Sequence, residues 1–187
     1  MKTLLSTFAL ILMFAVGCTD QTSITSPEQT VQTQEPHWLV SIPSQGLGIE
    51  TIHTASVLID GAKGGSVNFK GDFPGGPFGK VHVDSRLVIL SGSFTGSMVI
   101  SSNIDDFNLL TTFGPSYVFS KPLEYTLLIQ GVDLTGVNPA NVKFVYQAAD
   151  GSIHECESDG VDVDLSKGKV KVNKAKIPHF SRYGFVN

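Results

Sequence analysis

The sequence predicts an all-β fold built from antiparallel strands. From Thr51 onward, short segments of alternating apolar and polar residues are separated by turn signals, which is typical of a sandwich or barrel. No stretch of ten or more residues keeps a 3.6-residue apolar period without Gly or Pro, so we expect little helix. The chain has only two cysteines. Because they leave no disulfide framework, stability has to come from the burial of apolar side chains.

The individual strands are defined by this alternation and by the turns between them. Residues 61–65 (GAKGG) have the composition of a hairpin-like turn, and residues 71–79 (GDFPGGPFG) form a glycine- and proline-rich loop. Later turns are expected at Asp150-Gly151 and Lys167-Gly168. The expected strands cover residues 56–60, 66–70, 80–90, 97–101, 125–129, 142–148, 152–157, 161–165, 169–173 and 177–186.

The N-terminal 17 residues have the organisation of a cleaved signal peptide. Lys2 supplies a positive charge, residues 4–14 form an apolar run, and residues 15–17 (AVG) make a small-residue cleavage site. The apolar run is too short for a permanent membrane helix, which needs about 20 residues. We therefore expect cleavage between Gly17 and Cys18.

The segment AVGC at residues 15–18 resembles a bacterial lipobox, with Ala15 where leucine is commonest. The resemblance implies a lipoprotein whose Cys18 carries a diacylglycerol and an acylated amine, for example with palmitate, which is enough for stable membrane attachment. It also implies a location in the bacterial cell envelope. Thr19 after the cysteine is compatible with the outer membrane in a Gram-negative cell. Ordinary secretion is the alternative, because Ala15 and Gly17 also fit an A-x-A-like site.

Three parts of the chain follow from these observations: the signal peptide at residues 1–17, a lipidated cysteine and flexible linker at 18–50, and a β-domain at 51–187. Residues 19–36 are rich in Thr, Gln, Ser and Glu and cannot bury enough surface to offset the entropy of ordering. The 170 residues left after removing 17 from 187 are enough for one domain with a real core.

Composition argues against a nucleic-acid partner. Charged residues make up 16% of the chain, and the net charge is −4. The densest basic series alternates with apolar residues and is better explained as the solvated face of a strand. Its members are Lys167, Lys169, Lys171, Lys174 and Lys176.

Residues 111–129 (TTFGPSYVFSKPLEYTLLI) resemble the middle of ZU5-like domains, including those of bacterial surface lipoproteins. Residues 59–69 resemble the opening hairpin of that family, residues 91–101 its following turn and strand, and residues 179–183 its closing strand. The resemblance implies a ZU5-like antiparallel β-sandwich that serves for interaction or structure, mostly without chemistry.

The positions of two prolines are consistent with the strand boundaries that this resemblance implies. Pro115 and Pro122 lack a hydrogen-bond donor for a sheet, so we place them at strand starts or edges around a short strand near Val118.

Some ZU5-like domains cleave themselves between Phe and Ser of an H-F-S motif, which this chain carries at residues 179–181. The resemblance makes Ser181 the nucleophile, His179 its activator and Phe180 the residue whose carbonyl is attacked. That chemistry requires a strained peptide and oxyanion donors. The alternative is that His179 and Ser181 share one face of the last strand while Phe180 fills the core.

Other polar residues do not form a recognisable reactive centre. His82 and Asp84 share a strand face, as do His154 and Cys156, but each pair supplies only two of the three or four ligands that a metal requires. We therefore expect no metal and no cofactor. Cys156 is interpreted as a small buried residue. The acidic run of Asp159, Asp162 and Asp164 alternates as a strand and lacks the spacing of a calcium loop.

Four aromatic residues are candidates for binding: Trp38, Phe73, Phe78 and Tyr117. Phe73 and Phe78 lie in the loop at residues 71–79, where they could form an exposed platform for a sugar or a protein. Equally, the loop could fold back and plug one end of the sandwich.

The sequence thus predicts a membrane-anchored envelope lipoprotein whose domain is a non-catalytic interaction or structural module. Its partner, a protein or a glycan, is not identified by the sequence. A carbohydrate-binding module and a self-processing domain are the alternatives.

Overall fold

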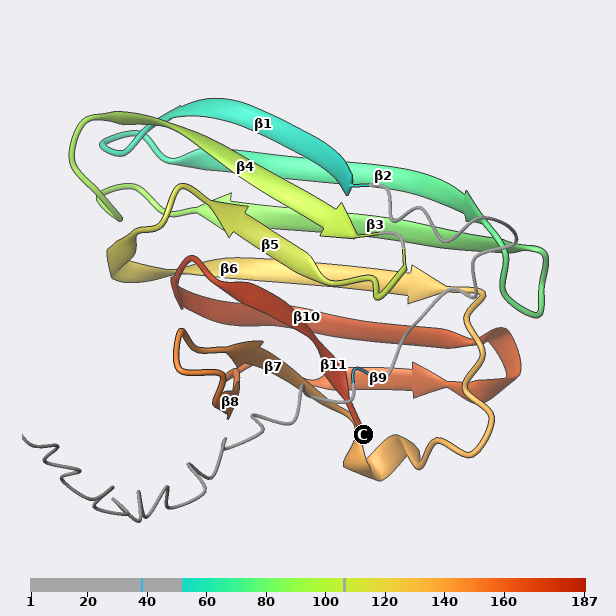
Figure 1. Cartoon of the computed structure of the whole chain (residues 1–187). Coiled ribbons are helices and arrows are strands. Elements are labelled where there is room, and N and C mark those ends of the chain that lie inside the picture. The colour runs from blue at the N-terminus through green and yellow to red at the C-terminus, as the bar shows by residue number, and fades with distance from the viewer. Residues whose placement is uncertain (1–37, 39–51, 106) are drawn as a thin grey trace, which may run out of the picture. The chain divides into compact units, whose positions relative to one another are not determined.

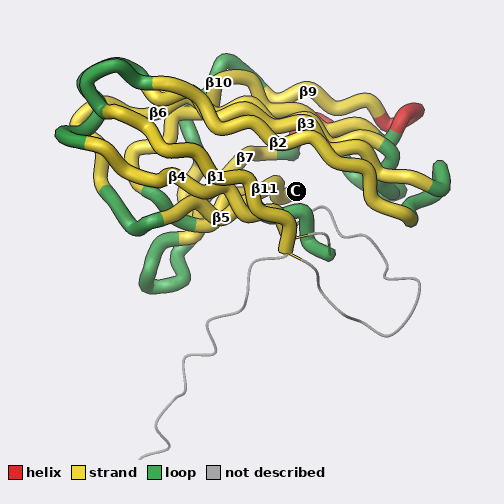
Figure 2. The backbone as a smooth tube through the Cα atoms, turned by 90° about the horizontal axis from the view of Figure 1, so that it is seen from above, coloured by secondary structure: helices red, strands yellow, loops and turns green. Residues whose placement is uncertain are grey.

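The computed structural model describes residues 38, 52–105 and 107–187. Their strands form two antiparallel sheets packed face to face, which confirms the predicted all-β sandwich (Figure 1, Figure 2). The six-stranded sheet has the order β1-β4-β5-β11-β7-β8, and the five-stranded sheet has the order β2-β3-β6-β10-β9.

The first sheet contains β1 (Ile52–Asp60), β4 (Ser97–Asp105), β5 (Thr111–Gly114), β7 (Lys143–Gln147), β8 (Ile153–Glu155) and β11 (Arg182–Val186). The second contains β2 (Gly65–Pro74), β3 (Lys80–Ile89), β6 (Val118–Gln130), β9 (Val161–Asp164) and β10 (Lys169–His179). Two short 3-10 turns, η1 (Pro139–Asn141) and η2 (Leu165–Lys167), are the helical elements of the described residues. Neither is long and apolar enough to cross a bilayer.

The predicted signal peptide, Gly17, Cys18 and most of the predicted linker lie outside the described residues. Trp38 is the described residue of that region, and it forms an isolated antiparallel bridge with Val186 of β11.

Strand alternation places apolar side chains between the sheets. In β10, Val170, Val172 and Ile177 are fully buried, while Lys169 and Lys171 point to the other side. These two lysines lie opposite Asp162 and Asp164 of β9. The interpretation of the lysine series as a solvated strand face is confirmed for this strand.

The predicted hairpin around residues 61–65 is wrong. β1 pairs with β4 and β2 pairs with β3, so the turn carries the chain from one sheet to the other. Gly61 makes this crossing possible, because a Cβ there would lie 2.1 Å from the carbonyl oxygen of Phe94. The backbone N–H of Gly61 donates to the carbonyl of Gly96 at 2.8 Å.

Three expected boundaries also need correction. The loop predicted at 71–79 is shorter, because β2 continues to Pro74 and pairs with β3 throughout. The short strand expected near Val118 is the beginning of β6, which runs through Pro122. The last expected strand, 177–186, is two strands, because the chain leaves one sheet at His179 and enters the other at Arg182.

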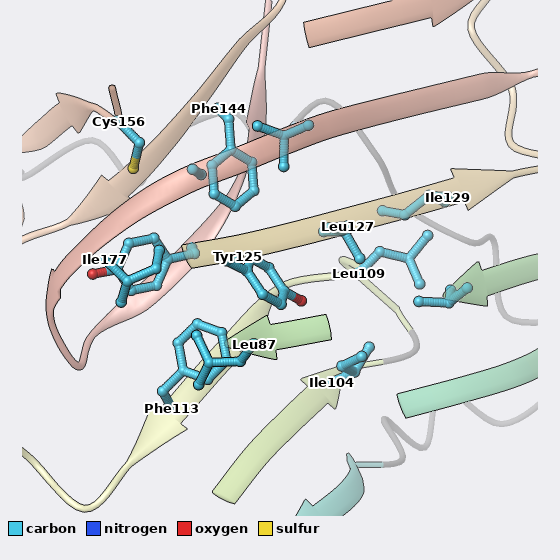
Figure 3. Close-up of a cluster of buried hydrophobic side chains, with 14 of the residues drawn as sticks. Leu87, Ile104, Leu109, Phe113, Tyr125, Leu127, Ile129, Phe144, Cys156 and Ile177 are labelled. Carbon is cyan, nitrogen blue, oxygen red and sulfur yellow. The ribbon is translucent and has the colours of Figure 1, made fainter. Parts of the chain in front are cut away.

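The core contains a hydrogen bond between the sheets. Tyr125 of β6 is fully buried, and its hydroxyl lies 2.9 Å from the hydroxyl of Thr111 in β5. Apolar neighbours surround it, including Leu87, Phe113 and Phe144 (Figure 3). Burial raises the pKa of Tyr125 to about 12, so the phenol stays protonated.

Candidate functional site

Three connections meet at the end of the sandwich where β2 turns into β3 and β6 ends (Figure 1). Gly75–Gly79 joins β2 to β3, residues 131–136 follow β6, and Leu165–Gly168 joins β9 to β10. The backbone N–H groups of Gly131 and Val132 donate to the carbonyl of Gly168, at 2.9 and 3.1 Å. These bonds tie the second and third connections together.

Glycines allow these backbones to approach closely. A Cβ on Gly76 would lie 2.2 Å from the carbonyl oxygen of Gly131, and one on Gly168 would lie 2.1 Å from that of Val132. Both glycines have positive φ angles, +66° and +53°, which L-residues with side chains adopt only with strain. The connections therefore form a well-defined surface.

Phe78 projects from this surface with 57% of its area exposed. A Cβ on Gly168 would lie 3.0 Å from the Cε2 atom of its ring, so one edge of the ring rests against the β9–β10 connection. Phe78 lines two hollows, one of about 450 Å³ and one of about 370 Å³. We call Phe78 and the two hollows the Phe78 site.

The first hollow, the polar hollow, has basic and amide side chains in its wall: Lys80, His82, Gln130 and Lys167, with Ser166 beside them. Two aspartates hold the basic groups. Asp72 accepts from Lys80 at 3.1 Å and lies 2.7 Å from Nδ1 of His82. Asp164 lies 3.5 Å from Nζ of Lys167.

Both aspartates are held in the ionised form. Hydrogen bonds from His82 and Lys80 lower the pKa of Asp72 below its usual value. The pKa of Asp164 is lowered by the hydrogen bond from Ser166 and then by the charge of Lys167. The wall is therefore charged, and its charges are largely paired.

The second hollow, the apolar hollow, is lined by Pro77, Val132, Leu134 and Leu165, with Asp133, Thr135 and Gly136. Leu165 has 48% of its area exposed. Phe78 thus lines two hollows, of which only the first contains basic side chains.

The four aromatic candidates do not form one platform. Phe73 has only 4% of its area exposed and packs 4.8 Å from the ring of His53, so its predicted role in an exposed platform is wrong. β2 continues past it and turns its side chain into the core. Neither alternative for the loop describes Phe73, because it is buried as part of strand β2 and not by a loop that folds back. Phe78 is exposed, as the platform alternative predicted.

Trp38 and Tyr117 lie elsewhere. Trp38 is half-buried over β11, within 3.0 Å of the position of a Cβ on Gly184. Tyr117 precedes β6 and Phe78 precedes β3, and these strands are antiparallel, so the two residues lie at opposite ends of the sandwich (Figure 1).

The H-F-S motif forms the corner where the chain crosses from one sheet to the other. Phe180 is buried, as the alternative interpretation predicted, and its N–H donates to the carbonyl of Tyr117 at 2.9 Å. The other half of that interpretation is wrong, because β10 ends at His179 and β11 begins at Arg182, so His179 and Ser181 share no strand face. The hydroxyl of Ser181 donates to the carbonyl of Gln147. The ring of His179 packs edge-on against Tyr146, with centroids 4.8 Å apart.

Neither residue of the Phe180-Ser181 peptide has a positive φ angle. Among the described residues other than glycine, positive φ angles occur at Leu109 and Lys174 and at neither Phe180 nor Ser181. The geometry therefore offers no strained φ at the peptide that self-cleavage would break.

The predicted metal pairs have other neighbours. Asp84 forms an ion pair with Lys70 at 2.7 Å, while His82 is bound to Asp72. His154 stacks on Tyr146 and lies 2.8 Å from the hydroxyl of Ser152. Within residues 38, 52–105 and 107–187, no group of three or more potential ligands could hold a metal ion.

Cys156 lies buried next to Glu155. Burial, and then the charge of Glu155, raises the pKa of its thiol to about 12. The thiol is therefore protonated and a poor nucleophile at neutral pH, in agreement with its interpretation as a small buried residue.

No family model matches the chain, and no curated protein matches it.

Sequence reasoning selected Phe78 but missed its polar neighbours. Asp72, Lys80, Gln130 and Lys167 come from three different parts of the chain, and pairing between strands brings them together. The sequence did contain a signal for them. Phe69 and Phe73 alternate with the charged residues Lys70 and Asp72, which indicates that the strand continues into the predicted loop.

Proposed function

We propose that the chain is a membrane-anchored lipoprotein of the bacterial cell envelope whose ZU5-like β-sandwich acts as a non-catalytic interaction module. Residues 1–17 and Cys18 support the anchor, through the signal peptide and the lipobox-like segment. The exposure of Phe78, which lines two hollows, carries the proposal for the domain. Aromatic side chains held on rigid loops are frequent contact points for ligands.

The chemistry of the site favours binding over catalysis. Lys80 and His82 share Asp72, and Lys167 pairs with Asp164. Side chains paired in this way orient a ligand through hydrogen bonds, whereas a catalytic base needs a free electron pair directed at the substrate. At the other end, Ser181 already donates its hydrogen to Gln147.

The anchor is tested by the intact mass of the protein purified from its native membrane fraction. We expect a chain that begins at an acylated Cys18 and ends at Asn187. The variant Cys18→Ser is the control and should leave the membrane fraction. An unmodified Cys18 would overturn the anchor, and a chain that ends at Phe180 would show self-processing instead.

The binding role is tested by sedimentation of the full mature chain, solubilised in detergent, with washed envelope material from the native cell. Phe78→Ala should reduce the bound fraction by about tenfold, the loss typical of an interface anchor. Phe107→Ala is the matched control, because Phe107 is 42% exposed and lines neither hollow. Equal binding by wild type and both variants would overturn the role of the Phe78 site.

A further inference from the structure

The two hollows that Phe78 lines suggest what its ligand looks like. One edge of the ring is fixed against Gly168, and the side chain lines both hollows with 57% of its area exposed. A flat aromatic ring can stack on the C–H face of a pyranose, because those C–H groups are apolar while the hydroxyls point outward. Each hollow has the volume of a small-ligand site.

The polar hollow supplies charged hydrogen-bond donors. Its lining residues include three basic side chains, Lys80, His82 and Lys167, and none of its lining residues is acidic. The carboxylates of Asp72 and Asp164 contact these groups and hold them in place. A basic group fixed by an ion pair loses less entropy when it binds an anion.

We propose that the Phe78 site binds a pyranose that carries an anionic group, either a uronic carboxylate or a phosphate. The sugar ring stacks on Phe78, and its anionic group enters the polar hollow beside Lys80 and Lys167. Gln130 and Ser166 are within the same hollow and can bind the hydroxyls. The inference rests on the proposed function, because it names the ligand of the same site.

The surroundings argue against an anionic membrane surface as the occupant. Away from the hollow, the outer face of the five-stranded sheet carries Asp84, Glu124 and Asp162 among its lysines. A broad anionic surface would meet these carboxylates, whereas a single sugar reaches only the hollow. The basic side chains of the polar hollow are therefore expected to bind one small anionic group and not an extended anionic surface.

The test measures binding of soluble sugars to the full mature chain in detergent by isothermal titration or NMR shifts. The probes are trigalacturonate, its neutral counterpart galactotriose, and mannose 6-phosphate with mannose as its neutral counterpart. We expect one or both anionic probes to bind at least about tenfold more tightly than the neutral counterpart, with an affinity that falls as salt rises. The two anionic probes distinguish a carboxylate from a phosphate.

Variants separate stacking from charge. Phe78→Ala should weaken binding of the anionic sugar by about tenfold or more, and Phe78→Trp should preserve it. Lys80→Gln and Lys167→Gln should each weaken it by about threefold to tenfold and reduce its dependence on salt. Phe107→Ala should leave it unchanged. Because all of these side chains are exposed, thermal unfolding should show that the variants remain folded.

The outcomes distinguish the inference from the proposed function. If the neutral sugars bind as tightly as the anionic ones, or if no sugar binds while the envelope is still bound through Phe78, the inference is wrong and the proposed function stands. If neither the sugars nor the envelope material depend on Phe78, both are wrong.

Discussion

At one end of the sandwich Phe78 leaves 57% of its area in solvent, whereas Phe180 at the other end leaves 6%. Phe180 packs against Phe119 and Phe113, with ring centroids 4.7 and 5.5 Å apart. Phe78 instead rests by one edge on a glycine. Both residues lie in connections between strands. The burial of an aromatic ring in such a connection therefore depends on how the neighbouring chain segments pack around it.

The backbone explains the difference. At the Phe78 end, the backbones of Gly76 and Gly168 lie so close to the carbonyls of Gly131 and Val132 that no Cβ fits at these two contacts. At the Phe180 end, the chain crosses from one sheet to the other, and Phe180 enters the space between them. The ring of Phe78 is therefore exposed and accessible to a ligand, whereas the ring of Phe180 packs between the two sheets and stabilises their contact.

The largest expected effect follows from removing each ring. Phe180→Ala should lower the free energy of unfolding by about 3–5 kcal/mol, because it leaves a cavity among packed rings. Phe78→Ala should change it by less than about 0.5 kcal/mol, as for other surface substitutions. Urea unfolding of the two variants measures the difference, and equal losses would show that the two ends are not distinct.

A smaller effect is expected from the glycines of the Phe78 end. Gly168→Ala should destabilise by about 3 kcal/mol, because the new methyl group adds a steric clash to the cost of a positive φ. Gly79→Ala is the matched control. Gly79 also has a positive φ, +76°, but a Cβ there would meet nothing within 4 Å, so only about 1 kcal/mol should be lost.

Gly168→Ala should also displace the ring of Phe78, which lies 3.0 Å from the new Cβ position. Ligand or envelope binding should therefore fall in this variant and stay unchanged in Gly79→Ala. If both variants lose the same stability and keep full binding, the close approach of the connections does not position the ring.

The strands themselves could be predicted from the sequence, but part of their pairing could not. The alternation of Val81, Val83, Leu87 and Ile89 predicted β3 closely, because a strand with one buried face has a period that can be seen directly. The pairing of β1 with β4 could not be predicted in this way. It depends on the crossing at Gly61, where the limiting contact is with Phe94, more than thirty residues further along the chain.

The sequence likewise predicted only part of the site, namely the exposed ring of Phe78. Phe78 and Phe73 looked alike, since both stood in a segment rich in Gly and Pro. The strand that continues to Pro74 buries Phe73 and ends before Phe78. The basic wall beside Phe78 could not be predicted from local patterns, because Lys80, Gln130 and Lys167 meet only through the pairing of β3 with β6 and the β9–β10 connection.

The smallest expected effect concerns the carboxylates at the two ends. Hydrogen bonds from His82 and Lys80 lower the pKa of Asp72, while hydrogen bonds from Ser152 lower the pKa of Asp150 at the other end. A lowered pKa means that each carboxylate stabilises the fold above its unfolded pKa of about 4, and that this contribution is lost as the pH falls through the folded value. Asp72→Asn and Asp150→Asn should each make unfolding less sensitive to pH below about pH 4.

Salt should separate the two aspartates. The partners of Asp72 include the cation of Lys80, 3.1 Å away, and the interaction is exposed to solvent, so added salt screens it. The main partner of Asp150 is a neutral hydroxyl and backbone N–H, which salt affects less. Urea unfolding at pH 2–5, in about 0.05 M and 0.5 M NaCl, should therefore show a salt-dependent difference between wild type and Asp72→Asn. The difference between wild type and Asp150→Asn should be nearly independent of salt. If added salt reduces both differences in unfolding free energy equally, the contacts of Asp72 with Lys80 and His82 are no more sensitive to salt than the hydroxyl contact of Asp150. The polar hollow would then lose its basis for attracting an anion.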